Sequence, residues 1–114
     1  MGIIAENVIR FNHIRSDIID LAASINEEFG EVFAHASSDE GSEEDPTALV
    51  FLDIPSFSTF SKDQMVLFNS AMCEADGVNF LILPEEYIRI TLSICNYWEQ
   101  EKNPYSTDVV DLFH

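Results

Sequence analysis

The sequence contains few basic residues. Five lysines and arginines stand against 21 aspartates and glutamates, which gives a formal charge of −16, and residues 16–61 contain eleven acids without a single lysine or arginine. DNA, RNA and anionic membranes attract cationic surfaces, so this composition argues against direct binding to any of them. The charge exceeds what solubility requires. It indicates a partner protein with a basic surface.

Signals for export and membrane insertion are also missing. The N-terminal residues Met-Gly-Ile-Ile-Ala-Glu have no basic stretch before an apolar run, and no apolar run has the length of a membrane-spanning helix. Glu6 occupies the position where an N-myristoylation signal requires Ser or Thr. These absences predict a cytoplasmic protein.

Cysteine and histidine are too sparse for a disulfide framework or a metal site. Cys73 and Cys95 lie in apolar segments without CxxC spacing, and we predict that both are buried thiols. His13, His35 and His114 are far apart in the chain, and none has a cysteine or aspartate at zinc-ligand spacing. We therefore expect no metal and no cofactor.

Motifs for catalysis are missing as well. The serine-rich segments contain no GxSxG turn, no glycine-rich loop could hold a phosphate, and residues 39–45 lack the alternating pattern of a calcium-binding loop. Glu85 and Glu86 are adjacent, but their place after Pro84 suits the first turn of a helix better than an acid/base pair. We expect that this protein is not an enzyme.

The apolar pattern that is present predicts one compact domain over residues 1–114. Apolar residues recur every three or four positions over residues 4–29, which indicates one amphipathic helix that ends at Gly30. Residues 31–36 and 47–54 have the composition of strands. The acidic residues 37–46 between them would form a hairpin loop.

The second half of the chain predicts further helices and a strand. Ser61 and Gln64 have the spacing of a capping box that opens a helix. An apolar strand at residues 78–83 would complete a right-handed β-α-β unit over residues 47–83. Residues 87–98 alternate like a strand, but the preceding proline and acids favour a helix. The predicted fold is therefore α+β, with three helices and a small three-stranded sheet in the order α-β-β-α-β-α.

The acidic residues concentrate on one stripe of the first helix and in the loop. A rotation of about 100° per residue puts four of the helix acids on one side, opposite the apolar residues, and the loop at 37–46 holds five carboxylates in ten positions. A purely solubilising surface is the alternative, because charged outer faces are the rule for helices. We predict that the following carboxylates bind the partner: Asp17, Asp20, Glu27, Glu28, Glu31, Asp39, Glu40, Glu43, Glu44 and Asp45.

The combination of small size, strong acidity, no targeting signal and no catalytic motif resembles the small acidic inhibitors made by phages, including anti-CRISPR and anti-restriction proteins that act as DNA mimics. The resemblance implies a protein that occupies the duplex-binding channel of a CRISPR surveillance complex or restriction enzyme, with carboxylates where phosphates would lie. It assigns no role to any single residue.

Two other functions remain open from the sequence. An immunity or antitoxin protein that neutralises a basic nuclease toxin would also need an acidic surface with fast, steered association. A salt-adapted domain would be acidic without any basic partner. If the acids only solubilise the chain, Phe57 and residues 109–113 are the remaining candidate contacts.

Overall fold

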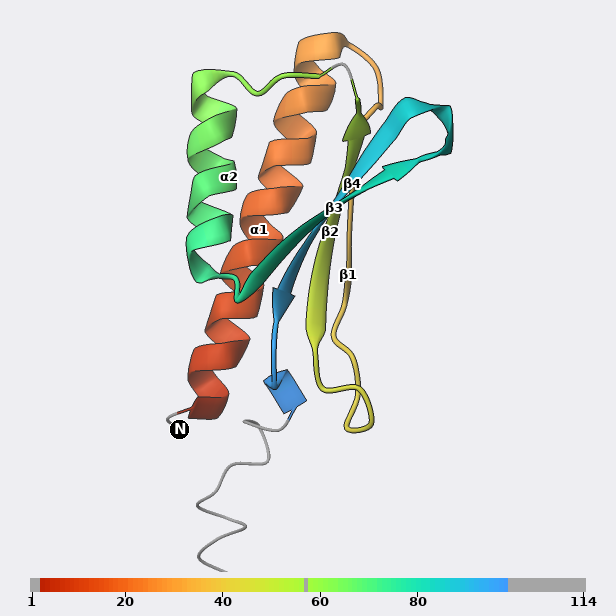
Figure 1. Cartoon of the computed structure of the whole chain (residues 1–114). Coiled ribbons are helices and arrows are strands. Elements are labelled where there is room, and N and C mark those ends of the chain that lie inside the picture. The colour runs from red at the N-terminus through yellow and green to blue at the C-terminus, as the bar shows by residue number, and fades with distance from the viewer. Residues whose placement is uncertain (1–2, 57, 99–114) are drawn as a thin grey trace, which may run out of the picture.

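The computed structural model describes residues 3–56 and 58–98, which form two helices and a four-stranded sheet (Figure 1). Within them the chain is an α+β domain, as the sequence predicts, but with one helix fewer and one strand more. A short 3₁₀ turn, Pro84–Glu86, joins the last two strands. The elements in order are α1 (Ile3–Phe29), β1 (His35–Asp39), β2 (Ala48–Pro55), α2 (Lys62–Glu74), β3 (Gly77–Leu83) and β4 (Tyr87–Ile94).

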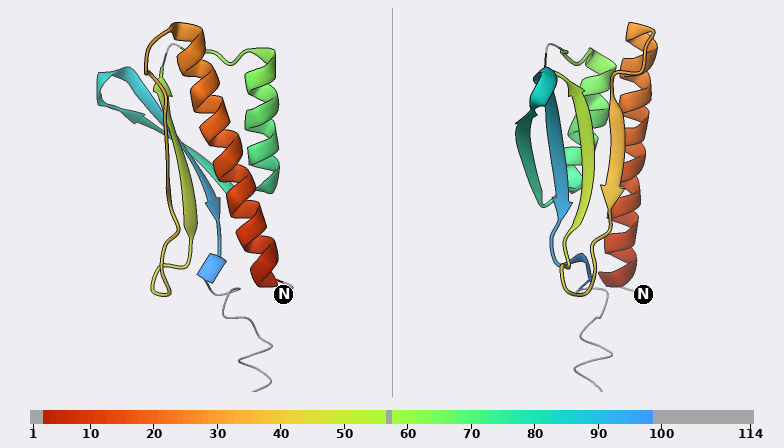
Figure 2. Two further views of the ribbon diagram at one scale, coloured as in Figure 1. Left: turned by 180° about the vertical axis from the view of Figure 1, so that it is seen from behind. Right: turned by 90° about the vertical axis from the view of Figure 1, so that its right-hand side faces the viewer.

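The sheet is antiparallel throughout, with the strand order β1-β2-β4-β3. Both helices lie on one face of it, and β1 and β3 form its two edges (Figure 2). β1 lies beside α1, whereas the β3–β4 hairpin leans away from α2 toward its tip (Figure 1). The sheet therefore has one covered face and one open face, the usual arrangement for antiparallel strands.

The core lies between α1 and the two central strands. α1 buries a residue at every third or fourth position, and alternate residues of β2 and β4 point toward it. α2 adds Phe68 and Ala71 to this core. Its other large members are Phe11, Ile14, Ile18, Leu21, Ile25, Val50, Leu52, Ile54, Ile90, Leu92 and Ile94.

Both predicted helices of the first 76 residues are confirmed, with the expected end of α1 and the expected start of α2. The expected end of α2 near Asp76, with Gly77 as its stop, is wrong: α2 ends at Glu74, and Gly77 begins β3. α1 is continuous over 27 residues. It stops where Gly30 adopts a left-handed conformation with φ +72° and donates its N–H to the Asn26 carbonyl at 2.9 Å. α2 opens with the expected capping box: Ser61 Oγ accepts the Gln64 N–H at 3.2 Å, and Gln64 Oε1 accepts the Ser61 N–H at 2.9 Å.

The predicted helix over residues 87–98 is wrong, because residues 87–94 form β4. Ile88, Ile90, Leu92 and Ile94 alternate toward the helices, and β-branched side chains pack well on a pleated surface. The proline and acids that suggested a helix start instead form the tip of the β3–β4 hairpin. Period-two alternation was therefore the stronger signal.

The expected three-stranded sheet and β-α-β unit are corrected by the same strand. β2 and β3 are each antiparallel to β4, so they run in the same direction, as a β-α-β unit requires. They are not neighbours, however, because the tight turn at Pro84–Glu86 folds β4 into the space between them. The crossover through α2 therefore skips one strand.

The first strand begins at residue 35, not 31, and the acidic loop shortens to residues 40–47. The side chain of Asn26 holds the intervening backbone: its Oδ1 accepts the N–H groups of Phe33 and Ala34, both at 2.7 Å, and its Nδ2 donates to the Ala34 carbonyl at 3.0 Å. This segment is thus bound to α1 and cannot pair with β2. Asp39 becomes part of β1.

The prediction of buried thiols is also wrong, because Cys73 and Cys95 are both exposed. Cys73 lies in the last turn of α2 on the side away from the core, and Cys95 follows the end of β4. Phe57 and residues 109–113, the other candidate contacts, lie outside the described residues. No helix in the described ranges has the length and apolar character needed to cross a membrane.

Candidate acidic interface

Four carboxylates line a groove of about 460 Å³ between the C-terminal half of α1 and the start of α2. Asp20, Glu27 and Glu28 come from α1, and Asp63 comes from the first turn of α2. None of the described residues that line the groove is basic. We call these four residues the groove cluster.

Gln64 holds the two walls of this groove together. Its side chain is 2% exposed, and its Nε2 donates to Ser24 Oγ at 3.1 Å and to Glu28 Oε1 at 3.0 Å. The N-terminus of α2, which carries the positive end of the helix dipole, favours the nearby carboxylates. All four acids of the groove cluster are exposed to solvent, and Glu28 also has a structural bond.

The same face of α1 continues toward the N-terminus with Arg10 and His13, which contact the C-terminal end of α2. Arg10 donates to the Glu74 carbonyl at 2.7 Å and to Asp76 Oδ1 at 2.9 Å. His13 Nδ1 lies 3.3 Å from Glu74 Oε1. Basic groups here are favoured by the negative end of the helix dipole. The stripe that the sequence placed opposite the core therefore borders α2 along its length.

The second group of acids lies in the β1–β2 loop, which is internally ordered. Asp39 Oδ1 accepts the Gly41 N–H at 2.9 Å, and Ser42 and Asp45 exchange two hydrogen bonds at 2.9 and 3.2 Å. Trp98 Nε1 donates to the Glu40 carbonyl at 2.7 Å and so ties the loop to the end of β4. We call its acids the loop cluster, which comprises Asp39, Glu40, Glu43, Glu44 and Asp45; all five are exposed.

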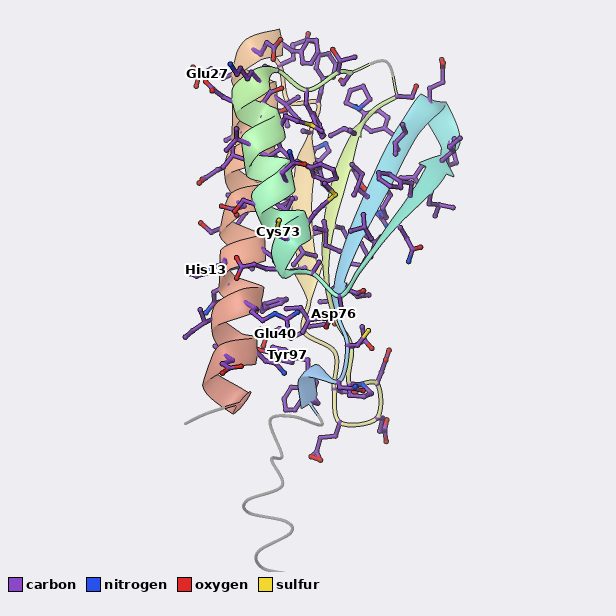
Figure 3. All side chains as sticks on the ribbon, turned by 60° about the vertical axis from the view of Figure 1, so that its left-hand side comes forward. His13, Glu27, Glu40, Cys73, Asp76 and Tyr97 are labelled. Carbon is purple, nitrogen blue, oxygen red and sulfur yellow. The ribbon has the colours of Figure 1, made fainter. Side chains whose placement is uncertain are left out.

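The structure separates these two clusters instead of joining them. Glu27 lies at one end of the molecule and Glu40 toward the other (Figure 3), along the α1 helix of 27 residues and about 40 Å. The separation arises because β1 runs back along α1 and returns the loop to the helix N-terminus. Asp17 is half-buried and Glu31 exposed, and neither lines the groove.

A basic side chain on the open face of the sheet is neutralised by its neighbour. Arg89 forms two hydrogen bonds with Asp53, Nε to Oδ1 at 2.8 Å and an Nη to Oδ2 at 2.9 Å, and its guanidinium lies 5.1 Å from the centroid of the Phe51 ring. The bonds with Asp53 raise the pKa of Arg89 above its ordinary value. This charge therefore adds no cationic character to either acidic cluster.

Sequence reasoning missed two features that depend on packing. Asp63 joins the groove cluster only because α2 packs against α1, although the capping box at Ser61 already placed it in a first turn. An apolar groove of about 190 Å³ also opens between α2 and the β3–β4 hairpin, and Ser58 Oγ is buried in it without a hydrogen-bond partner among the described residues. Its apolar lining consists of Ile54, Phe60, Phe68, Phe80, Ile88 and Ile90.

No group of three or more His, Cys, Asp or Glu side chains in the described residues is placed to hold a metal ion. Comparison of the chain with protein-family models, curated proteins and solved structures finds no match. Function must therefore be inferred from the surfaces of the molecule itself.

Proposed function

We propose that this protein binds a basic nucleic-acid-binding protein or complex, such as a CRISPR surveillance complex or a restriction enzyme, and blocks its binding of DNA or RNA. The observation that carries the proposal is the groove cluster, in which four carboxylates share one groove whose lining, among the described residues, contains no basic side chain. Ordinary surfaces intersperse charges of both signs. A groove whose charged side chains are all negative favours a partner with a positively charged surface.

The spacing of the acids suits a surface that normally holds phosphates. Asp20 and Glu27 are seven residues apart, about 10 Å along the helix, a length over which one DNA strand presents roughly three phosphates. Lysines and arginines that are spaced to bind the phosphates of a duplex could therefore bind the carboxylates of the groove cluster. Each exposed charge pair contributes only about 0.2–1 kcal/mol, so binding depends on several pairs together.

The distance between the two clusters adds a second constraint on the partner. The groove cluster lies on the C-terminal half of α1 and the loop cluster near its N-terminal end, so the two are separated by part of a helix about 40 Å long, itself the length of about twelve base pairs at 3.4 Å each. A binding channel for a short duplex would accept both clusters at once, whereas a small basic patch would accept only one. Long-range attraction between opposite charges also raises the association rate more than the affinity.

The experiment is competition between this protein and a labelled duplex for the partner. Affinity capture from a host lysate supplies candidate partners, and fluorescence anisotropy with the purified candidate then measures displacement of the duplex. The groove variant carries Asp20→Asn, Glu27→Gln and Asp63→Asn, with Glu28 unchanged because of its bond to Gln64. The control removes the same number of charges from exposed positions outside both clusters: Glu6→Gln, Glu85→Gln and Glu86→Gln.

We expect the parent to displace the duplex, the groove variant to require at least about tenfold more protein, and the control to match the parent. Direct binding of the parent to the purified partner should weaken as the salt concentration rises, because exposed charges are screened over about 8 Å at physiological ionic strength. Equal loss in both variants would mean that only net charge matters and would contradict the proposal. A captured nuclease toxin whose cleavage is blocked would support the immunity function instead.

A further inference from the structure

The two edges of the sheet differ in how they are protected. β1 has the sequence His-Ala-Ser-Ser-Asp: it is short and polar, it ends in a carboxylate and it lies beside α1. β3, Gly77–Leu83, has seven residues and contains no lysine, no proline and no charge. Soluble proteins protect edge strands with lysine or other charged residues, or with proline. An exposed apolar edge that lacks them tends to pair with another strand. Among the described residues β3 has one neighbour, β4.

β3 also exposes three consecutive apolar side chains. Phe80 is 63% exposed, Leu81 58% and Ile82 79%. Phe80 and Ile82 point to the helix side of the sheet, since they pair with Ile90 and Ile88, and Leu81 points to the open side. Exposed apolar side chains thus lie on both faces of the sheet along β3. This is the pattern expected of an edge strand that lacks a neighbour.

The exposed apolar side chains supply much of the area that a dimer needs. A phenylalanine side chain offers roughly 150–250 Å², so at these exposed fractions the three side chains contribute roughly 350 Å² per copy and roughly 700 Å² for two copies. The strand backbones and flanking side chains add to this when two strands pair. The total then approaches the ~1,000 Å² above which protein interfaces become specific.

The strand is compatible with itself in direction and charge. Antiparallel pairing of β3 with β3 of a second copy relates the two chains by a two-fold axis and continues the antiparallel sheet. With the axis near Leu81, Phe80 of one copy lies opposite Ile82 of the other, and both lie on the helix side. No charges of like sign meet within the strand, because residues 77–83 carry none.

We propose that β3 is the interface of a symmetric homodimer, in which two copies pair through this strand into one eight-stranded sheet. Both pairs of helices then lie on the same face, and the exposed Phe80 and Ile82 side chains of the two copies cover one another beside the apolar grooves. The acidic clusters lie on α1, the start of α2 and the β1–β2 loop, so they remain accessible in the dimer.

The test is the oligomeric state of the whole chain, measured by sedimentation velocity over a range of concentrations. We compare the parent with Ile82→Lys, which puts the usual protecting residue on the β3 edge, and with Ser37→Lys on the exposed β1 edge as a control of equal charge. The parent and the control should dimerise, and Ile82→Lys should raise the dimer dissociation constant at least tenfold. Circular dichroism confirms that each variant is folded.

Salt should strengthen the dimer, because two copies that each carry −16 repel one another at low ionic strength. This dependence is opposite to that expected for binding to a basic partner, so the dimer and the proposed function can fail separately. A parent that remains monomeric between about 50 and 500 mM salt overturns the inference, and so does a dimer unaffected by Ile82→Lys. Loss of partner binding in Ile82→Lys without any dimer would assign β3 to a strand of the partner instead.

A cross-link gives a second measurement that does not depend on a destabilising change. In a Cys73→Ser, Cys95→Ser background, Leu81→Cys lies near the proposed axis, where opposed Cβ atoms about 4.5–5.5 Å apart approach disulfide distance. Mild oxidation should produce a covalent dimer. Ser37→Cys in the same background should remain monomeric, and equal yields from both positions would count against pairing through β3.

Discussion

Gln64 of α2 donates a hydrogen bond from Nε2 to Oε1 of Glu28 on α1, at 3.0 Å. The same side chain closes the capping box that starts α2. One buried amide thus fixes both the beginning of a helix and its attachment to the acidic stripe of the other helix. The side chain needs an oxygen to accept the Ser61 N–H and an N–H group to donate to Glu28.

Replacing Gln64 with glutamate should separate these two roles. The introduced carboxylate can still accept the Ser61 N–H, but it cannot donate to Glu28 and puts a second negative charge beside it. We expect a loss of about 2–4 kcal/mol in the free energy of unfolding at neutral pH. The loss should shrink on acidification, since protonation of either carboxylate removes the repulsion.

Chemical denaturation at two pH values measures this effect. Asn69→Asp makes the same change of amide to acid at an exposed position of α2 and should cost less than about 0.5 kcal/mol. Equal costs at the two positions would show that the bond to Glu28 does not stabilise the helix pair.

Gly41 and Gly30 should respond differently to alanine although both have positive φ. Gly30, at φ +72°, has nothing within 4 Å of an added Cβ, so alanine costs only the left-handed backbone, about 1–2 kcal/mol. At Gly41, φ +76°, a Cβ would lie 2.5 Å from the Asp45 carbonyl oxygen and 2.6 Å from that of Thr47. Gly41→Ala must therefore also open the loop.

The tryptophan indole detects whether the loop opens. Trp98, the one tryptophan of the chain, donates to the carbonyl of Glu40 next to Gly41. Gly41→Ala should shift its fluorescence and accelerate proteolysis of the loop, whereas Gly30→Ala should lower only the melting temperature. A Gly41→Ala protein with parental fluorescence would contradict this account of the loop.

The elements that the sequence predicted correctly are those with local signals. The period of α1, the glycine that ends it and the capping box of α2 depend on residues within a few positions of one another. The strand β4 was missed because the proline and acids at residues 84–86 were given more weight than the alternation that follows them. The other error in the strands came from a distant contact. β1 starts late because Asn26, on α1, binds the backbone of Phe33 and Ala34, and no local pattern reports that bond.

The acidic site shows the same limit. The helical stripe brought Asp20, Glu27 and Glu28 onto one face correctly. Two other placements required the tertiary fold: α2 supplies Asp63 to the groove, and β1 carries the loop to the far end of α1. The sequence therefore supplied the acids of the helix and of the loop, but neither Asp63 nor the separation of the two clusters.

The Arg89–Asp53 pair should contribute measurably to the stability of the sheet. It joins β4 to β2 through two bonds, and Arg89 also lies over the Phe51 ring. A double-mutant cycle with Arg89→Lys and Asp53→Asn should give a coupling energy of about 0.5–1 kcal/mol, since the pair is partly exposed. A lysine keeps the charge but cannot form the two parallel bonds.

The pH dependence of the stabilisation by this pair follows from the direction in which the pKa of Arg89 is shifted. The pKa of Arg89 is raised in the folded protein by its bonds with Asp53, so the stabilisation from this shift is complete below the ordinary pKa of arginine and is lost only above the raised pKa of the folded protein. The coupling should therefore be unchanged between pH 7 and about pH 10. A coupling that disappears in that range would mean that another group titrates with the pair.

The acidic clusters should reduce the stability of the protein that carries them. A net charge of −16 stores repulsion in the folded state, and the four acids of the groove cluster share one groove. The Asp20→Asn, Glu27→Gln, Asp63→Asn variant should therefore melt a few degrees higher than the parent at low salt, a gain of about 1 kcal/mol. Asp63 favours the start of α2 through the helix dipole, so restoring it alone should raise the melting temperature further.

Salt titration of the melting temperature separates repulsion from ion pairing. If repulsion dominates, the parent gains stability as salt rises toward about 0.5 M, because screening acts most strongly on exposed charges, and the variant gains less. If the acids instead stabilise the fold, the variant melts lower and salt destabilises the parent. Higher stability together with weaker competition against a duplex would identify carboxylates that are retained for binding, since a surface needed only for solubility has no reason to concentrate repulsion in one groove.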